Sequence, residues 1–229
     1  MAGIQVKNLT KKFDDLLVLD NISFEVADHD FMCIVGPTGC GKTTFLNSLT
    51  KLYDITAGEI LVDGEPVDLK KHNISYIFQE TSTMPWLSVE ENVGFGLQMM
   101  DIVGLTQFRK YYPAQLSSSM LQRVAIARAF ATKPDLLLMD EPYGQLDIEL
   151  RFKLEDELVK LWKATGTTIL FITHNIEEAV YLAEKILVLT NKPTKVRELV
   201  ADEIPRPRDI ADPEFVDLRN RVTDLIKWW

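Results

Sequence analysis

A glycine-rich turn between an apolar run and a helical pattern constrains this chain more than any other feature. The run Phe31–Val35 has the length and the β-branched ending of a buried strand. The helical pattern after the turn has one apolar face, made of Phe45, Leu46, Leu49 and Leu52. The turn reads G-x-x-x-x-G-K-[ST], the spacing of a phosphate-binding loop. A chance glycine-rich turn would not explain this order of strand, loop and helix, so the sequence predicts a site for a nucleoside triphosphate.

The turn supplies the groups that hold phosphate. Backbone N–H groups between the glycines can close around an anion, and the helix start adds the positive end of its dipole. Lys42 is expected to reach the terminal phosphates, and the hydroxyl of Thr43 is expected to ligate Mg²⁺. The nucleotide-binding residues predicted here are Gly36, Pro37, Thr38, Gly39, Cys40, Gly41, Lys42, Thr43 and Thr44.

Strands that alternate with helices predict an α/β fold. Apolar runs at residues 135–140, 167–173 and 185–190 are typical of strands buried on both faces. With the phosphate loop, they predict a P-loop NTPase core with a mostly parallel sheet. Alternating segments on either side of Asp14, and a hairpin with the turn Asp63–Gly64, predict an N-terminal antiparallel β-subdomain.

The chain is predicted to be a single domain with three parts. Residues 1–79 and 134–200 form the β-subdomain and the P-loop core, and residues 80–133 form an inserted α-helical subdomain. Residues 201–229 form a C-terminal extension that begins with the break Ile204–Arg208 and ends in a helix capped by Asp212 and Pro213. The apolar stripe of this helix is Phe215, Leu218, Val222, Leu225 and Trp229. Such a stripe usually docks on its own domain, and a subunit contact is the alternative.

The charge balance limits the possible partners. Lys+Arg 25 against Asp+Glu 34 gives a net charge of −9, which disfavours non-specific binding to nucleic acid and to an anionic membrane. No apolar run approaches the ~20 residues of a spanning helix, and no signal peptide is recognisable, so we expect a cytoplasmic protein. Cys33 and Cys40 make no disulfide framework. Cys40, just before a helix start, is expected to carry a reactive thiol that nucleotide protects, whereas Cys33 should react slowly.

Two carboxylates follow the apolar run at 136–139. At the C-terminal end of a parallel strand, Asp140 is expected to hold Mg²⁺, and Glu141 is expected to orient and polarise the attacking water. Two solvated acids at a strand end are the alternative for either residue alone. The pair, after four apolar residues in a P-loop protein, favours nucleotide hydrolysis.

Together with further motifs, these features make residues 4–229 resemble the ATP-binding subunit of an ABC transporter. The resemblance rests on Phe13 after Lys-Lys, Gln79 in Ile-Phe-Gln-Glu, Leu116–Ser117 before Gln-Arg-Val-Ala-Ile-Ala-Arg-Ala, Asp147 in Tyr-Gly-Gln-Leu-Asp, and His174 in Ile-Thr-His-Asn. It implies an ATPase with ATP and Mg²⁺ as cofactors. It also implies that Phe13 stacks on adenine beside Val18, and that His174 contacts the γ-phosphate; a core histidine is the alternative for His174.

The remaining roles also come from the resemblance. Gln79 would sense the γ-phosphate and Mg²⁺ and abut a permease. The implied catalytic residues are then Glu141, His174 and Gln79, and the implied metal ligands are Thr43, Gln79 and Asp140. The nucleotide contacts made across a dimer would come from Ser117, Ser118, Ser119 and Asp147.

The chain departs from the family pattern in two places. The signature Leu-Ser-Gly-Gly-Gln (or Met) reads Leu116–Met120 here, with Ser118 and Ser119 in place of the glycines. Each serine adds a Cβ, at a cost of about 1 kcal/mol or more if its φ must be positive. Serine is also a good N-cap, so the helix itself should survive. In addition, Met100–Asp101 joins what are normally separate helices, which predicts a short helical subdomain.

The resemblance implies a subunit that energises a membrane importer. Its partners would be transmembrane permease subunits, a second copy or a paralogous ATP-binding subunit, and indirectly a solute-binding protein, on the cytoplasmic side of the membrane. The segments around Trp86, around Asp147 and at Ile204–Arg208 resemble the nitrate/sulfonate/taurine/bicarbonate importer branch. A helix-cap packing role is the alternative for Trp86. Two other functions stay open: a weakly hydrolysing partner subunit, and a soluble ABC-type ATPase that acts on DNA or ribosomes.

Overall fold

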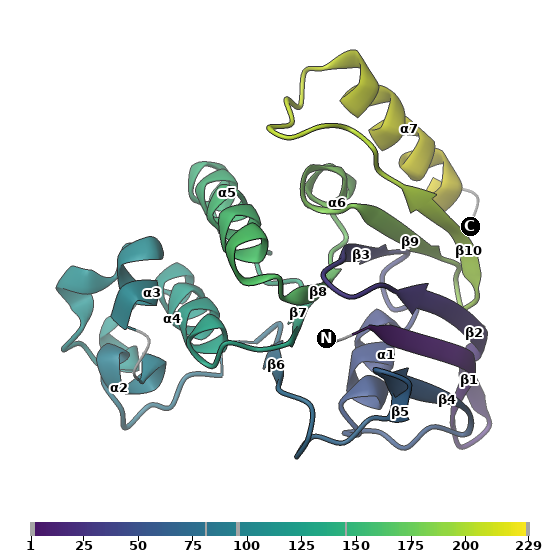
Figure 1. Ribbon diagram of the computed structural model, residues 1–229, viewed down its shortest axis with the longest axis horizontal. Helices are drawn as coiled ribbons and strands as arrows, with labels where there is room; N and C mark the ends of the chain where they lie inside the picture. The colour runs from purple at the N-terminus through teal and green to yellow at the C-terminus, as the bar shows by residue number, and fades with distance from the viewer. Residues whose placement is uncertain (1–2, 81, 95–96, 145, 228–229) are drawn as a thin grey trace. The chain divides into compact units, whose positions relative to one another are not determined.

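The computed structural model describes residues 3–80, 82–94, 97–144 and 146–227. The chain divides into two compact units, which Figure 1 shows by residue colour. The first unit contains residues 1–72 and 168–229, and the second contains residues 73–167. The second unit is larger than the helical subdomain predicted at 80–133, because it also contains two strands and a long helix.

The first unit contains the predicted antiparallel sheet. Its strand order is β2-β1-β4-β5, with β1 at Ile4–Phe13, β2 at Leu16–Val26, β4 at Ala57–Val62 and β5 at Glu65–Pro66. Asp63 and Gly64 join β4 to β5 with φ of 54° and 77°. Positive φ at both central residues is what the tight hairpin turn requires, and Asp and Gly tolerate it. Both predicted hairpins are confirmed.

The other strands of the first unit carry the phosphate loop. Their order is β10-β9-β3-β8, with β3 at Phe31–Val35, β8 at Thr168–Ile172, β9 at Lys185–Leu189 and β10 at Val196–Ala201. Strand β3 pairs in parallel with β8 and β9, and all five of its residues are buried, as expected of a strand covered on both faces. The antiparallel strand β10 was not predicted, because charged Arg197 and Glu198 interrupt its apolar pattern.

Helix α1 (Lys42–Leu49) is shorter than the predicted apolar face required. Phe45, Leu46 and Leu49 are buried as expected, but Leu52 is 58% exposed. The helix ends at Leu49, and Lys51 has a φ of 57°, which turns the chain away from the helix axis. The placement of Leu52 on this face was therefore wrong.

The C-terminal helix α7 (Pro213–Lys227) docks on its own unit. The Asp212 carboxylate accepts a hydrogen bond from the Glu214 amide at 2.9 Å, which caps the helix as predicted. Phe215 and Val222 are fully buried, and α7 contacts β9, β10 and α6 (Ile176–Leu182), as Figure 1 shows. The docking interpretation of this stripe is confirmed for the described residues; Trp229 lies outside them.

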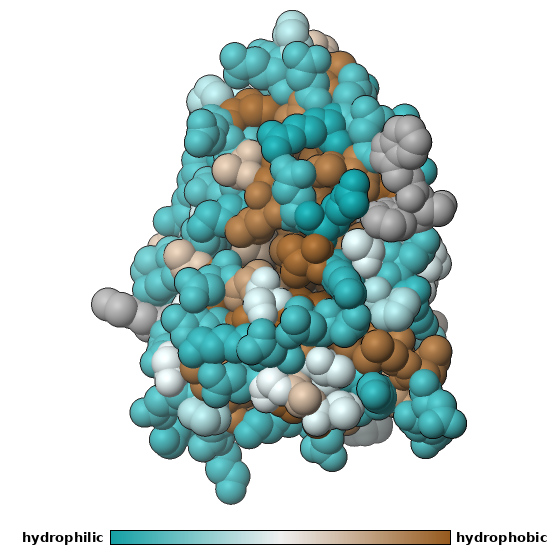
Figure 2. All heavy atoms as spheres, turned by 90° about the vertical axis from the view of Figure 1, so that its right-hand side faces the viewer, coloured by the Kyte–Doolittle hydropathy of each residue, from teal (hydrophilic) through white to brown (hydrophobic). Residues whose placement is uncertain are grey.

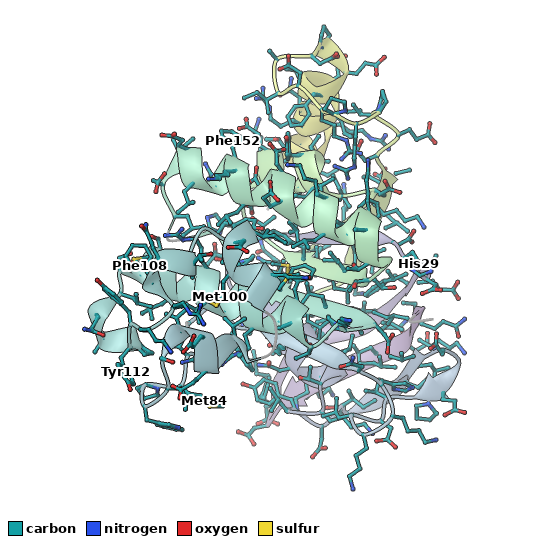
Figure 3. The ribbon with its side chains drawn as sticks, turned by 60° about the vertical axis from the view of Figure 1, so that its left-hand side comes forward. His29, Met84, Met100, Phe108, Tyr112 and Phe152 are labelled. Carbon is teal, nitrogen blue, oxygen red and sulfur yellow. The ribbon has the colours of Figure 1, made fainter. Side chains whose placement is uncertain are left out.

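The second unit has two parallel strands and a group of helices. The strands are β6 (Ile74–Ile77) and β7 (Leu136–Asp140). The helical elements are α2 at Val89–Val93, α3 at Leu97–Ile102, η1 at Thr106–Phe108, η2 at Pro113–Gln115, α4 at Ser118–Ala131 and α5 at Ile148–Thr165. Figure 3 labels Met84, Met100, Phe108, Tyr112 and Phe152 in this unit.

Two predictions about the helices of this unit can be examined. Met100 and Asp101 both lie inside α3, so the chain is one helix there, as the sequence indicated. Trp86 lies before α2 and is 72% exposed, so the helix-cap packing role for Trp86 was wrong. The cap of α2 is instead Ser88, whose side chain and that of Glu91 form a capping box.

Within the described residues, none of the helices has both the length and the apolar character that crossing a membrane would demand. Figure 2 shows one face of the protein, on which hydrophilic residues surround smaller apolar patches.

Candidate nucleotide site

The phosphate loop connects β3 to α1 and has the backbone that its glycines permit. Gly39 has a φ of 75° and Gly41 a φ of 112°, a region that residues with a side chain rarely adopt. Gly41 is the N-cap of α1, so the first backbone N–H groups of the helix border the loop. The side chains of Thr38 and Thr43 are exposed at the loop and the helix start. This arrangement offers donors and positive dipole to an anion.

Close packing against Leu189 and Val18 fixes the position of the phosphate loop. A Cβ at Gly36 would lie 3.0 Å from the Leu189 carbonyl oxygen and 3.1 Å from the Leu189 Cβ, at the end of β9. A Cβ at Gly41 would lie 2.9 Å from Cγ1 of Val18. A side chain at either position would therefore crowd its neighbours, and Gly41 also has a backbone conformation that favours glycine. The predicted neighbour of the adenine, Val18, is buried directly against the loop.

Lys42 already lies inside the curve of the loop. Its ammonium donates hydrogen bonds to the carbonyl oxygens of Gly36 at 2.9 Å and Pro37 at 3.2 Å, and the residue is only 6% exposed. These two carbonyl oxygens hold the ammonium in the loop, where it can donate charge-assisted hydrogen bonds to a phosphate. The loop residues therefore fit a triphosphate.

A residue that sequence reasoning missed supports the loop. Thr194 is fully buried, and its hydroxyl donates a hydrogen bond to the Cys40 carbonyl oxygen. Strand β2 holds the backbone of Thr194 by two hydrogen bonds, each of 2.9 Å. The Thr194 N–H donates to the Val18 carbonyl oxygen, and the Thr194 carbonyl oxygen accepts from the Asp20 N–H. No motif surrounds Thr194, so only the three-dimensional contact identifies it.

The expected reactivity of Cys40 was wrong. Cys40 is 1% exposed, and burial raises the pKa of its thiol by more than the Lys42 ammonium lowers it. The thiol points into the packing between Gly36 and the rest of the loop, where a Cβ on Gly36 would approach its sulfur to 3.1 Å. Cys33 is buried in β3 as predicted, and burial raises its pKa as well.

Phe13, the predicted adenine platform, is 37% exposed at the end of β1. Its ring meets the ring of Tyr53 edge to face, with centroids 5.3 Å apart. The Lys11 ammonium lies 4.5 Å from the Phe13 centroid and donates a hydrogen bond to the Asp54 carbonyl oxygen at 2.6 Å. Tyr53 and Lys11 were not predicted, because the loop that carries Tyr53 has no recognisable motif.

The predicted carboxylates lie at the C-terminal end of β7. Asp140 is 2% exposed and Glu141 is half-buried, with a φ of 47° that is rare for a residue with a side chain. The amide Nε2 of Gln79 lies 3.4 Å from Oε2 of Glu141 and donates to it. Because β6 and β7 are parallel neighbours, Gln79 and the two carboxylates come together at one edge of the second unit.

These side chains suit a magnesium ion that also binds phosphate. Mg²⁺ prefers oxygen ligands and is usually held by one or two carboxylates together with substrate phosphates. The described part of the chain has no group of three His, Cys, Asp or Glu residues that could hold a metal on its own. Asp140, the Gln79 amide oxygen and the Thr43 hydroxyl are oxygen donors of the expected kind, and the first two come together in the second unit.

The signature serines form an ordinary helix start. Ser117 is the N-cap of α4, and its hydroxyl accepts a hydrogen bond from the Met120 N–H at 3.3 Å, as predicted. Ser118 and Ser119 lie in the first turn of α4, and Ser119 Oγ lies 3.2 Å from Ser117 Oγ. The cost of a positive φ at these serines does not arise. Asp147 caps α5 in the same way, accepting from the Leu150 N–H at 2.9 Å.

His174 is exposed, so the core-histidine alternative was wrong. It directly follows β8, which pairs in parallel with β3, the strand that precedes the phosphate loop. The ends of β3 and β8 are joined by a hydrogen bond from the Thr173 N–H to the Ile34 oxygen at 3.4 Å. His174 and the phosphate loop therefore lie at the same edge of the sheet in the first unit.

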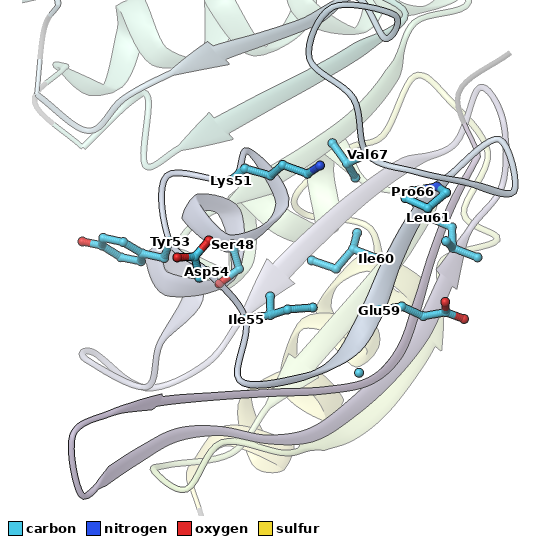
Figure 4. Close-up of a pocket in the computed structure, with 11 residues that line it drawn as sticks. Ser48, Lys51, Tyr53, Asp54, Ile55, Glu59, Ile60, Leu61, Pro66 and Val67 are labelled. Carbon is cyan, nitrogen blue, oxygen red and sulfur yellow. The ribbon is translucent and has the colours of Figure 1, made fainter.

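A separate pocket of about 310 Å³ lies beside α1 in the first unit (Figure 4). It is lined by Ser48, Lys51, Tyr53, Asp54, Ile55, Gly58, Glu59, Ile60, Leu61, Pro66 and Val67. Among the described residues, this lining shares none with the phosphate loop. Tyr53 connects the rim of the pocket to the Phe13 ring.

The sequence is similar to ATP-binding proteins of transporters. Residues 19–144 match the family described as "ABC transporter". An uncharacterized ABC transporter ATP-binding protein of Methanocaldococcus jannaschii is 40% identical over 98% of this chain and 91% of its own length. An aliphatic sulfonates import ATP-binding protein SsuB of Bacillus cereus is 38% identical over 97% of this chain and 93% of its own.

The fold is similar to a solved ATP-binding cassette. The bacterial ABC transporter cassette MJ0796 has a TM-score of 0.79 and 29% identity, over 88% of this chain and 100% of that one. That cassette is described as dimeric, and as bound to ADP and Pi in a post-hydrolysis state. The two sheets, one antiparallel and one mostly parallel, and the phosphate loop agree with the sequence relatives. This chain is an ATP-binding ATPase subunit of the ABC transporter family.

Proposed function

We propose that this ATPase drives the import of a small anionic or organic solute, with sulfonates as the first candidates and nitrate, taurine and bicarbonate as the others. The observation that carries this proposal is the likeness to SsuB sulfonate importers at 38% identity over nearly the whole chain. The sulfonates are named in those proteins, and the transfer to this chain rests on that likeness.

The proposal assigns a role to each predicted site residue. The loop from Gly36 to Thr44 holds the phosphates, with Lys42 as the cation nearest to the transferred group. Phe13 offers one ring face to the adenine, because Lys11 and Tyr53 lie against other parts of the ring. Thr43, Gln79 and Asp140 would hold Mg²⁺, which would neutralise developing charge on the phosphates.

The hydrolytic step belongs to Glu141, Gln79 and His174. Glu141 accepts a proton from the attacking water, and Gln79, 3.4 Å from its carboxylate, keeps that carboxylate oriented. His174 donates a hydrogen bond to the γ-phosphate.

A second copy or a paralogous subunit completes the assembly. Ser117, Ser118, Ser119 and Asp147 are proposed to face the nucleotide bound by the other subunit, and the dimeric cassette MJ0796 supports a two-subunit arrangement. The N-terminal end of the 14-residue helix α4 can still direct N–H groups at that phosphate.

The permease is the proposed membrane partner, and the chain would bind it on the cytoplasmic side. Exposed apolar residues of the second unit that lie close to Gln79 in the sequence supply a contact surface. These are Phe78, Met84 and Trp86, which are 39%, 44% and 72% exposed. A solute-binding protein would act on the permease from the opposite side.

The test is transport by the purified complex. The tagged chain is isolated with its permease from detergent-solubilised membranes, reconstituted in vesicles and loaded with ATP, and uptake of radiolabelled alkanesulfonate, taurine, nitrate and bicarbonate is compared. We expect ATP-dependent uptake of one of these solutes, abolished by Lys42→Ala. Recovery of the chain with DNA or ribosomes, and no membrane protein, would contradict the proposal.

One observation favours weaker hydrolysis as a second candidate. The serine-filled signature adds two side chains at a surface that the family keeps clear. If the chain is a weakly hydrolysing partner subunit, the purified homodimer will bind ATP normally and turn it over only when a paralogue is added.

A further inference from the structure

Two arginines close the carbonyl end of helix α6. A helix leaves its last C=O groups without partners inside the helix, and cations near that end also interact favourably with the helix dipole. Arg206 and Arg208, from the segment Ile204–Arg208, donate hydrogen bonds to these groups. The acceptors are the carbonyl oxygens of Val180 at 2.7 Å, Tyr181 at 2.9 and 3.2 Å, Leu182 at 2.6 Å and Ala183 at 2.6 Å.

The hydrogen bonds that Arg208 makes to the end of α6 are deeply buried. The Arg208 side chain is 2% exposed and lies 3.1 Å from the carboxylate of Asp202, which is 0% exposed. Burial lowers the pKa of both guanidinium groups, that of Arg206 to about 10, which leaves Arg206 charged at neutral pH. Burying an ion pair is expensive in desolvation and often contributes little net stability. A geometric role explains this arrangement better than stability alone.

His174 directly precedes Asn175, the N-cap residue at the opposite end of α6. Asn175 caps the helix, accepting from the Glu177 N–H at 3.0 Å, and its own N–H donates to the Thr173 hydroxyl at 3.0 Å. The helix has seven residues, so at 1.5 Å per residue its two ends are about 10 Å apart. A displacement of so short a helix moves both of its ends together.

The other sides of α6 are also covered within the first unit. Figure 1 shows α6 between the strands β3 and β9 and helix α7. Contacts with β3 and α7 fix the helix sideways, and Arg219 of α7 lies 3.4 Å from the Glu177 carboxylate. Movement along the helix axis is what the two arginines oppose.

We infer that Arg206 and Arg208 are positioning residues for the ATPase reaction: they hold α6 by its carbonyl end and thereby keep His174 in place at the other end. This inference rests on the proposed contact of His174 with the γ-phosphate. It gives the Ile204–Arg208 segment a task in catalysis, although the segment lies outside the phosphate loop. Loss of the arginines should therefore reduce turnover more than it reduces ATP binding.

The variants are Arg206→Met and Arg208→Met, which keep most of the aliphatic length, and Arg206→Lys, which keeps a donor and the charge. Replacing Arg206 should disturb the fold less than replacing Arg208, because Arg206 is only half-buried. The matched control is Arg221→Met, an exposed arginine of the same C-terminal region that pairs with Glu198. For each full-length protein, kcat, the ATP dissociation constant and the fraction folded are measured.

A second readout follows the histidine itself. The chain has three histidines, so the imidazole proton signals in an NMR spectrum can be assigned with single His→Gln variants. In Arg206→Met we expect the His174 signal to shift or broaden while the signals of His29 and His72 stay in place. A purely structural role for Arg206 would not single out His174.

The expected result is a fall in kcat of at least about tenfold for Arg206→Met and Arg208→Met, with ATP affinity within about twofold of the parent protein. Arg206→Lys should recover part of the loss, and Arg221→Met should change nothing. Unchanged kcat per folded molecule, or an unmoved His174 signal in Arg206→Met, would overturn the inference. Full activity of His174→Ala would instead refute the proposed role of the histidine, which keeps the two failures distinct.

Discussion

Thr194 and Cys40, 154 positions apart in the chain, are joined by a hydrogen bond from a fully buried hydroxyl to a phosphate-loop carbonyl. Thr194→Val has nearly the same shape but removes the donor, and an unsatisfied buried carbonyl costs about 1–3 kcal/mol. We expect a lower free energy of unfolding, weaker ATP binding, and faster maleimide labelling of Cys40. Urea unfolding, calorimetry and mass spectrometry measure these three quantities.

The control for this prediction is Thr194→Ser, which keeps the hydroxyl and loses only a methyl group. It should bind ATP like the parent protein. If the valine and serine variants weaken ATP binding equally, packing rather than the hydrogen bond supports the loop.

Lys42→Ala should weaken ATP binding. Charge-assisted hydrogen bonds to phosphate contribute about 1.5–3 kcal/mol, so the dissociation constant should rise by roughly ten- to more than a hundredfold. Calorimetry with ATP measures the change, and Lys12→Ala, at an exposed lysine of β1, is the control. An unchanged affinity in Lys42→Ala would remove this lysine from the site.

Glu141→Gln should retain ATP and lose hydrolysis. A positioned general base contributes roughly 10²–10⁴ in rate, and the amide keeps the size of the side chain. The variant should also accumulate as an ATP-bound dimer, visible by sedimentation. Glu149→Gln, at an exposed acid in the first turn of α5, should behave like the parent protein. Turnover at the parent rate in Glu141→Gln would mean that another residue activates the water.

We expect the signature serines to weaken the ATP-driven closure of two subunits around the nucleotide. The cause would be crowding by their side chains alone, because their backbone is helical. Ser118→Gly with Ser119→Gly would remove two Cβ atoms, and should raise turnover and ATP-driven dimerisation without changing the affinity of one subunit for ATP. The matched control replaces both serines by alanine, which keeps each Cβ. Equal rates and equal sedimentation for the glycine and alanine versions would show that the serines fit without crowding.

Asp202 should make stability depend on pH. Burial raises its pKa to about 6, against the opposing effect of Arg208, so between about pH 4 and 6 the folded chain binds a proton that the unfolded chain has released. Its contribution is therefore present below about pH 4 and is lost as the pH rises through 6. The unfolding free energy of the parent protein, relative to Asp202→Asn, should fall between pH 4.5 and pH 7.

Urea unfolding at several pH values measures this difference, with Asp217→Asn, at an exposed acid of α7, as the control. The change should not exceed a few kcal/mol, because one pKa unit corresponds to about 1.4 kcal/mol. A flat difference across this pH range would show that Asp202 is already ionised at pH 4.5.

Local sequence patterns predicted the elements that depend on neighbouring residues. The strand, loop and helix at 31–49 follow from hydrophobic periodicity and glycine spacing, and the Asp63–Gly64 turn follows from two residues that tolerate positive φ. Strand β10 was not predicted because it is an edge strand, where one face meets water and charged residues interrupt the apolar pattern.

The parts of the site that could not be predicted depend on contacts between distant segments. Burial of Cys40 is set by packing around Gly36, and Thr194 reaches the loop because its backbone is hydrogen-bonded to Val18 and Asp20 of β2. The side chains of Arg206 and Arg208 look like solvated charges in the sequence, and only the fold brings them to the end of α6. Such positions have no local signal, because their partners are far away in the chain.

The burial of both cysteines makes this protein convenient for spectroscopy. Since Cys33 and Cys40 are inaccessible in the folded chain, a single cysteine introduced on the exposed surface, for example at Glu149 or Asp217, can carry a spin label or a fluorophore without removal of the native thiols. Distances between two such labels in a dimer would then report opening and closing directly, in a protein whose phosphate loop has not been altered.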